Sequence, residues 1–386
     1  MRIGINSNGL HCNTGYGIQA RHLAVRLRDA GHEVAVFANY GVKGAVLTIG
    51  GFPHYPSGRL EYNADVIEGH VEHWRCDVLI ALADVAHQDP ETTQRIRARG
   101  VQVLHWMPVD CDPLSTLDET ILRLGGGQPV AMSRFGEQIL RARGFDPLYV
   151  PHCVDTGIFT PMPPGARAEV RAAQDLGKCF TVAINAMNKD LLRKGFFEGY
   201  RAFAPFHARH PDTRILLHTD LDGRFDHEEE ITQLGLEKAV KVTGDYLIKI
   251  GALDEPWMAG WYNLADVVLM PSWGEGFGVP AIEGQACGLP VIATDCSALR
   301  ELVQPGTGWR VRGEPKYQPL HKRAWVAPSI EGLTRALEQA YAAWKGPAWQ
   351  TRQRKARAFA EIYDADRVFM EYWCLVLARL EAGDFK

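Results

Sequence analysis

The sequence predicts an α/β protein built from two doubly wound domains, and three observations lead to this expectation. Short runs of β-branched and apolar residues alternate with longer stretches of helical periodicity. Near-continuous apolar strands separated by helices are typical of parallel sheets that are covered by helices on both faces. The alternation forms two series, and the 386 residues of the chain exceed one ordinary domain of about 150 residues.

The expected strands follow from the apolar runs. In the first series they lie at residues 2–6, 33–39, 76–82, 101–107, 129–133 and 148–151. In the second series they lie at residues 179–185, 214–219, 240–244, 266–271 and 290–294. Helical stretches such as 17–30 and 196–210 separate them, so each series should form its own parallel sheet.

The boundary between the two series is expected at residues 159–165, which contain three prolines and one glycine. This composition suits neither a helix nor a strand and is typical of a linker. We therefore expect an N-terminal domain at 1–158, a C-terminal domain at 159–350 and a helical segment at 351–386. The sequence does not identify what the last segment packs on.

The composition narrows the classes of protein. No apolar run approaches the roughly 20 residues that span a bilayer, and the chain opens on a strand-like run without a signal-peptide pattern. The eight cysteines are dispersed and form no C-x-x-C pair, which argues against a disulfide framework or a zinc site. We expect a cytoplasmic protein without a transmembrane segment.

The net charge of −4 provides no overall attraction to nucleic acid or to anionic lipid. A nucleic-acid partner stays possible through local patches, but the charge does not indicate one. Arginines and lysines cluster at positions 95–99, 141–143 and 352–357, where solvated helix faces are the simpler interpretation. The sequence carries no indication of an oligomeric state.

The strongest local signal is the segment 271–283, Pro-Ser-Trp-Gly-Glu-Gly-Phe-Gly-Val-Pro-Ala-Ile-Glu, directly after an apolar strand. Its glycine-rich loop leads to Pro280, a residue suited to the first turn of a helix. Loop amides and a helix N-terminus together attract anionic or hydroxyl-rich ligands. Glu275 in the loop and Glu283 in the helix can accept hydrogen bonds from different hydroxyls of one elongated ligand. The alternative is a capping loop with two solvated glutamates.

This segment and its continuation at 285–295 closely resemble the E-x7-E donor motif of GT-B glycosyltransferases, particularly the retaining family 4. The resemblance implies two Rossmann-like domains facing across a cleft, with the acceptor on the 1–158 side and a nucleotide-diphosphate sugar (a UDP- or GDP-sugar) on the 159–350 side. It implies transfer of the sugar to an acceptor hydroxyl with retention of configuration. Glu275 would contact the transferred sugar and Glu283 the nucleotide ribose. The loop residues near the sugar or the diphosphate would be Gly276, Phe277, Gly278 and Val279.

The same resemblance assigns cations to the diphosphate, after the strand at 179–185. Lys194 matches the family's lysine, whereas Asn188 stands where an arginine is usual. Lys189 and Arg193 are the candidate replacements, because charge matters most and arginine adds bidentate geometry. A solvated basic turn is the alternative for this stretch. Catalysis would then need no metal and no cofactor beyond the nucleotide sugar.

In the N-terminal domain, Gly15 and Gly17 resemble the family's first loop, where glycine lets the backbone come close to a ligand. Asp110, after the strand at 101–107, is the candidate for orienting a sugar or acceptor hydroxyl, and a plain turn residue is its alternative. His105, inside that strand, is expected in the core. The pairs Asp110/Asp112 and Asp220/Asp222 have D-x-D spacing and are interpreted as turn residues rather than as metal ligands.

The acceptor is not identified by the sequence. Acceptors of the resembled family include glycans, lipids, small molecules and hydroxymethylated DNA bases, and the aromatic and histidine residues of 41–74 could line a groove for one. Two other functions stay open: a Rossmann-type oxidoreductase or epimerase, and a non-catalytic nucleotide-sugar binder. The first lacks the required G-x-G-x-x-G after the first strand.

Overall fold

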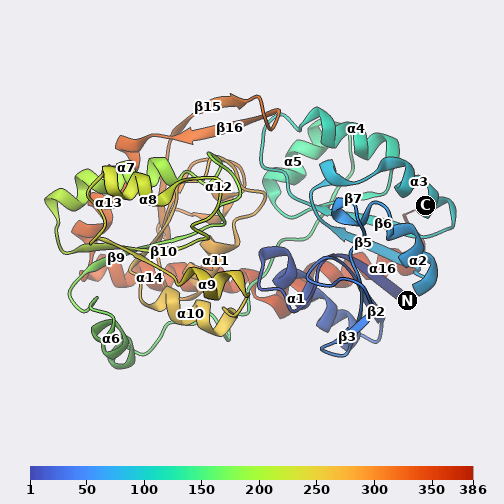
Figure 1. Cartoon of the computed structure of the whole chain (residues 1–386), viewed down its shortest axis with the longest axis horizontal. Coiled ribbons are helices and arrows are strands. Elements are labelled where there is room, and N and C mark those ends of the chain that lie inside the picture. The colour runs from blue at the N-terminus through green and yellow to red at the C-terminus, as the bar shows by residue number, and fades with distance from the viewer. Residues whose placement is uncertain (386) are drawn as a thin grey trace. The chain divides into compact units, whose positions relative to one another are not determined.

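The structure is a computed structural model that describes residues 1–385. The chain forms two compact units (Figure 1). The first contains Met1–Cys153 and the C-terminal stretch that starts at Ala365, and the second contains Val154–Asp364. The segment 351–386 is thus divided between the units, and the proline-rich stretch 159–165 lies inside the second.

The first unit contains an eight-stranded sheet in the order β3-β4-β2-β1-β5-β6-β7-β8. All neighbouring pairs are parallel except β3 and β4. The strands are β1 (Arg2–Asn8), β2 (Glu33–Tyr40), β3 (Leu47–Ile49), β4 (Phe52–Tyr55), β5 (Val78–Leu82), β6 (Gln102–Met107), β7 (Gln128–Ala131) and β8 (Leu148–Tyr149). The order runs outward from β1 in both directions, which defines a doubly wound sheet.

Helices connect the strands of the first unit. They are α1 (Gly15–Asp29), α2 (Ile67–Trp74), α3 (Pro90–Ala98), α4 (Thr116–Gly125) and α5 (Arg134–Ala142), with single turns η1 (Glu61–Asn63) and η2 (Val85–His87). The C-terminal stretch adds α15 (Ala365–Val368), η4 (Phe369–Trp373) and α16 (Cys374–Ala382). It is anchored by Trp373, whose ring lies 5.0 Å from that of Trp106 on β6.

The second unit contains a six-stranded, fully parallel sheet in the order β11-β10-β9-β12-β13-β14. The strands are β9 (Phe180–Asn185), β10 (Thr213–His218), β11 (Val240–Val242), β12 (Val267–Met270), β13 (Val291–Thr294) and β14 (Gly308–Val311). An antiparallel hairpin of β15 (Gly313–Gln318) and β16 (Arg323–Pro328) follows. Two doubly wound sheets, one fully parallel and the other parallel except for β3 and β4, confirm the predicted fold class.

The helices of the second unit are α6 (Pro164–Ala173), α7 (Phe196–Arg209), α8 (His227–Gln233), α9 (Asp245–Lys249), α10 (Glu255–Asn263), α11 (Val279–Ala286), α12 (Leu299–Leu302), α13 (Ile330–Ala343), α14 (Pro347–Ala360) and the turn η3 (Glu361–Tyr363). Phe180, Phe203 and Leu337 belong to the fully buried core that unites the sheet with α7 and α13. Among the described residues, no helix combines the length and the apolar character needed to cross a membrane.

A buried ion pair fixes the start of β12, the strand that leads into the glycine-rich segment. Asp266 is 2% exposed and accepts hydrogen bonds from Arg167 at 2.9 Å and from the Thr181 amide at 2.9 Å. Arg171, also buried, lies 3.3 Å from the second carboxylate oxygen. Helix α6 is thereby tied to the edge between β9 and β12.

Replacing Asp266 with alanine should therefore destabilise the protein. Two arginines would lose their carboxylate partner and one buried amide its acceptor, and breaking a buried pair from one side costs about 3–5 kcal/mol. Urea unfolding followed by circular dichroism measures the loss. As a matched control, Glu331→Ala removes an exposed carboxylate paired with Arg335 and should change stability by less than about 1 kcal/mol. Equal effects of the two substitutions would refute the role given to Asp266.

Candidate functional site

The segment between β12 and α11 is a buried, tightly held loop. Every residue from Pro271 to Gly278 is buried. Gly278 has a φ of +107°, a conformation that favours glycine, and it caps α11. A side chain at Gly278 would also meet Leu299 at 3.0 Å. A residue with a side chain at position 278 would therefore disturb the way in which the loop joins α11.

Glu275 is the charged centre of this loop. The residue is buried, with 6% of its surface exposed. Its Oε1 accepts a hydrogen bond from Lys194 Nζ at 2.7 Å. Arg193 approaches Oε2 at 3.4 Å. The Glu275 amide donates to Ser297 Oγ at 2.8 Å. The structure thus brings together three predicted site residues, Lys194, Arg193 and Glu275, although Lys194 and Glu275 are 81 positions apart in the sequence.

The segment that carries the two cations is itself held in place. Asp190 Oδ1 accepts hydrogen bonds from the amides of Leu192 and Arg193, both at 2.8 Å. The Arg193 carbonyl accepts a hydrogen bond from the Trp273 amide at 2.8 Å. Gly195 has a φ of +64°, and a Cβ there would lie 2.0 Å from the Pro271 carbonyl oxygen. The close approach of two backbones therefore requires glycine directly after Lys194.

These charges keep Glu275 ionised. Burial raises the pKa of its carboxyl, but the positive charges of Lys194 and Arg193, with hydrogen bonds from Lys194 and Ser272, outweigh burial and hold the pKa below its usual value. A buried carboxylate of this kind is stable only while its cations are present. Lysine and arginine N–H groups are also the donors that bind anionic ligands in proteins.

Glu283 has a different environment, without a cation among its hydrogen-bond partners. It is 6% exposed, and Tyr262 on α10 donates a hydrogen bond to its Oε2 at 2.8 Å. The Tyr262 hydroxyl in turn accepts a hydrogen bond from Asn185 Nδ2, at the end of β9, at 2.8 Å. Burial raises the pKa of Glu283 to about 7, while the hydrogen bond from Tyr262 lowers it and the charge of Glu255 raises it.

Tyr262 and Asn185 were not among the residues predicted from the sequence. Asn185 carries a weak signal, because a polar side chain that ends an apolar parallel strand lies where ligands bind in such sheets. Tyr262 carries none, since an aromatic residue in an apolar helix is usually a core residue.

Asn188, a predicted donor-site residue at the position where the resembled family usually has an arginine, binds the backbone of a neighbouring turn. It is 3% exposed, and both ends of its amide bind the backbone of Phe225, each at 2.8 Å. Its carbonyl accepts a hydrogen bond from the Arg224 amide at 3.0 Å. Asn188 therefore holds the 224–225 turn, and of the two candidate replacements Arg193 contacts Glu275 whereas Lys189 is exposed.

The candidate residues of the first unit lie after its strands. Thr14 caps α1 by accepting a hydrogen bond from the Gly17 amide at 3.1 Å. A Cβ at Gly17 would lie 2.2 Å from the Cys12 carbonyl, whereas a Cβ at Gly15 would meet nothing within 4 Å. Close packing therefore explains Gly17, and only Gly15 leaves room beside the backbone.

Asp110 is buried after β6. His105 lies in the core as expected, with Nε2 2.9 Å from the Gly126 carbonyl oxygen, and burial lowers its pKa to about 4. The segment 41–74, considered for an acceptor groove, contains β3, β4, η1 and α2.

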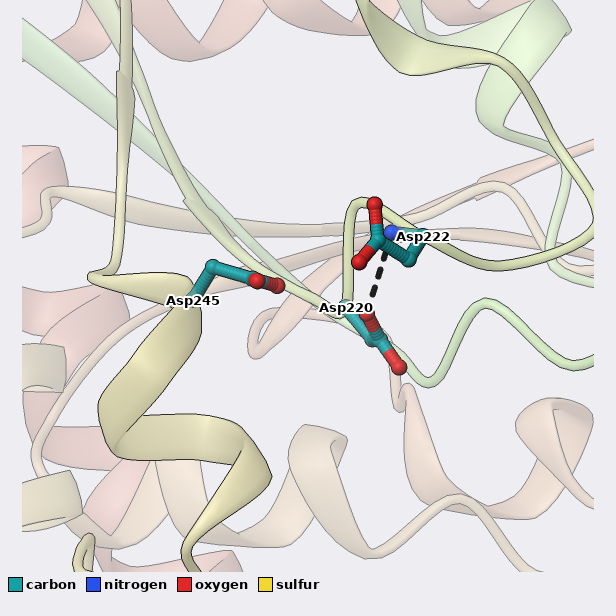
Figure 2. A group of neighbouring side chains, drawn as sticks. All are labelled: Asp220, Asp222 and Asp245. Atoms are coloured by element: carbon teal, nitrogen blue, oxygen red, sulfur yellow. Dashed lines mark hydrogen bonds between the residues drawn. The ribbon is translucent and has the colours of Figure 1, made fainter.

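The D-x-D pair of the second unit belongs to a group of three carboxylates. Asp220, Asp222 and Asp245 have oxygens within 4.8 Å of one another (Figure 2). The Asp222 amide donates to Asp220 Oδ1 at 3.0 Å, as in a turn. Lys249 contacts both Asp222 and Asp245, so a lysine already supplies a positive charge to the group.

Residues 182–341 match the family model described as Glycosyl transferases group 1. This segment includes Lys194, Glu275 and Glu283. The chain is 33% identical over 189 residues to a D-inositol 3-phosphate glycosyltransferase of Arthrobacter sp. (strain FB24), a match that covers 47% of this chain and 40% of the relative. The chain thus spans less than half the length of that relative. It is also 28% identical over 318 residues, 76% of each chain, to a phosphatidyl-myo-inositol mannosyltransferase of Mycolicibacterium smegmatis.

Solved structures share the fold over nearly the whole chain. Sucrose-phosphate synthase of Thermosynechococcus elongatus matches with a TM-score of 0.76 and 20% identity, over 99% of this chain and all of that one (100%). HepE of Anabaena, solved with UDP-glucose, matches with a TM-score of 0.71 and 16% identity, over 98% and 99% of the two chains. The fold is therefore the GT-B fold.

The ion pair at Glu275 makes a prediction about stability. Lys194→Met leaves the buried carboxylate with Arg193 alone, so unfolding free energy at neutral pH should fall by up to about 3 kcal/mol, the lower end of the range for a broken buried pair. Adding Glu275→Gln removes the charge that lost its partner and should restore part of the loss.

Urea unfolding of the two single variants and the double variant measures this coupling. The loss in Lys194→Met should shrink as the pH falls. Without Lys194, burial raises the pKa of the Glu275 carboxyl above its wild-type value, so this side chain becomes neutral at a higher pH in the variant. Strictly additive effects at pH 7 would show that the two side chains do not interact.

Proposed function

We propose that this chain is a glycosyltransferase that moves a sugar from a nucleotide-diphosphate sugar to an acceptor hydroxyl with retention of configuration. The observation that carries the proposal is the buried Glu275 held between Lys194 and Arg193. The cluster lies after β9 and β12, at the edge of a parallel sheet where ligands bind. The family match over residues 182–341 supports the same conclusion.

The cations and the carboxylates divide the donor between them. Lys194 and Arg193 offer N–H donors and positive charge to a diphosphate, where negative charge grows as the bond to the sugar breaks. Glu275 accepts hydrogen bonds from sugar hydroxyls and keeps both cations in place. Glu283, about one turn into α11, accepts from a hydroxyl of the nucleoside. In the first unit, Asp110 is proposed to orient a sugar or acceptor hydroxyl.

UDP-sugars are the first donors to test, because HepE was solved with UDP-glucose; GDP-sugars are the second. The two named relatives act on inositol-containing acceptors by their names, and both differ from this chain at most positions. We therefore leave the acceptor class open between glycans, lipids, small molecules and modified DNA bases. Candidate acceptors are incubated with the enzyme and the donor that it uses. The acceptor is the one whose mass, measured by mass spectrometry, increases by that of the transferred sugar.

Lys194→Ala should reduce kcat by roughly 100- to 1,000-fold, the usual cost of removing one preorganised group that stabilises transition-state charge. Release of nucleotide diphosphate measures the rate. Lys238→Ala, which removes an exposed lysine of the same unit, is the matched control and should leave the rate unchanged. A Lys194→Ala enzyme at the wild-type rate would reject the assignment of the cation.

The reaction is proposed to need no metal, since lysine and arginine supply the positive charge at the diphosphate. Activity should persist in excess EDTA. If EDTA abolished turnover and Mg²⁺ or Mn²⁺ restored it, metal-free transfer would be wrong, and Asp220→Asn and Asp222→Asn would show whether the acidic group holds the ion. Nucleotide-sugar binding without any turnover would instead define a non-catalytic binder, and binding of NAD in its place would point to an oxidoreductase.

A further inference from the structure

Three elements of the second unit meet at Glu283. Asn185 ends β9, Tyr262 lies on α10 and Glu283 lies on α11. Their side chains form one directed chain of hydrogen bonds: Asn185 Nδ2 donates to the Tyr262 hydroxyl at 2.8 Å, and that hydroxyl donates to Glu283 Oε2 at 2.8 Å. The Tyr262 side chain is fully buried at 0% exposure of the residue, so water does not compete for its hydroxyl.

The direction of this chain decides which atom of Glu283 can serve a ligand. A tyrosine hydroxyl has one proton to donate, and the proton supplied to Oε2 is fixed there because Asn185 occupies the acceptor side of the same oxygen. Oε2 is thus engaged inside the protein. Among the described residues, no hydrogen bond engages Oε1.

We propose that Tyr262, oriented by Asn185, is a positioning residue for donor binding, which holds Glu283 so that Oε1 accepts a hydrogen bond from a ribose hydroxyl of the nucleotide. The inference rests on the proposed function and extends it to residues that do not touch the substrate. Preorganisation of this kind lowers the entropy lost when the ligand binds.

The charged and titratable groups around Glu283 make its ionisation depend on Tyr262. Glu255 on α10 opposes its ionisation, and the Cys287 thiol, directly after α11, lies near it. Arg357 on α14 lies near Cys287, but its side chain donates hydrogen bonds to Glu361 and to backbone carbonyls, among them that of Ala286 at 2.9 Å. Tyr262 is therefore the hydrogen-bond donor that favours the carboxylate, whose pKa burial raises to about 7.

The sign of the pH effect follows from the charge of Glu283. The carboxylate is the better acceptor for a ribose hydroxyl, so nucleotide affinity should fall as the pH falls through the pKa of Glu283. Without the Tyr262 hydroxyl that pKa rises further, and the loss of affinity should begin at a higher pH. Glu275 should not contribute to this pH dependence, because its pKa lies below the usual value and it stays ionised near neutral pH.

The test compares two tyrosines of the same unit. Tyr200 is also fully buried, and its hydroxyl lies 2.9 Å from His227 Nδ1. Tyr262→Phe and Tyr200→Phe therefore each remove one buried, hydrogen-bonded hydroxyl. Isothermal titration with UDP-glucose and GDP-mannose between pH 6 and pH 8.5 measures affinity, and urea unfolding measures the stability of each variant.

Tyr262→Phe should weaken binding by about tenfold at pH 7, the effect of one hydrogen bond to a charged group, and should move the acid loss of affinity to higher pH. At saturating donor its kcat should stay within about twofold of wild type, since the hydroxyl acts on binding. Tyr200→Phe should keep wild-type affinity and pH profile. Glu283→Gln, which keeps the shape of the side chain, should abolish the pH dependence near neutrality.

Equal behaviour of the two phenylalanine variants, or a Glu283→Gln variant with the wild-type pH profile, would overturn the positioning role. Failure of the proposed function gives a different pattern. In that case the wild-type protein binds neither nucleotide sugar, or Glu283→Ala leaves their affinity unchanged. If Tyr262→Phe does not fold, Asn185→Ser, which removes the donor to Tyr262, should weaken binding in the same pH-dependent manner, and its wild-type behaviour would reject the inference.

Discussion

Burying the carboxylate of Glu275 is the constraint on which the rest of the second unit's site depends. A charge removed from water is tolerated only with partners, and here Lys194 and Arg193 supply them. This requirement joins the loop after β12 to the loop after β9. The positive φ and close backbone approach of Gly195, the Asp190 turn and the buried path of residues 271–278 all serve that junction.

The two glutamates of the segment show how environment separates identical side chains. Glu275 has cations and stays ionised. Glu283 has no such cation, and burial, with a smaller contribution from Glu255, raises its pKa although the Tyr262 hydroxyl lowers it. One position therefore carries a fixed negative charge that organises cations. The other carries an acceptor whose strength depends on pH. A sequence motif that names both residues as glutamate does not distinguish these roles.

Much of the fold follows from the sequence because parallel strands buried on both faces must be apolar throughout. The strands β9, β12 and β13 are such runs, and the structure contains each of them. The β15–β16 hairpin has no comparable signal, since its exposed strands mix glycine, proline and charged residues.

The last 20 or so residues return to the first unit through contacts such as Trp373 with Trp106, and no local pattern encodes a partner so distant in sequence. Asn188 is similar: its role depends on Phe225, 37 positions later. Within the site, local sequence supplied the glutamates and Lys194, but the Tyr262 contact arises only from the packing of α10 against α11.

A crystal structure with the nucleotide sugar that the protein binds most tightly tests the central claim most directly. In that structure the diphosphate should contact Lys194 and Arg193, and the sugar should contact Glu275. A ribose hydroxyl should lie within hydrogen-bond distance of Glu283 Oε1 while Tyr262 keeps Oε2. A nucleotide sugar bound away from these residues, or a ribose that contacts neither oxygen of Glu283, would contradict it.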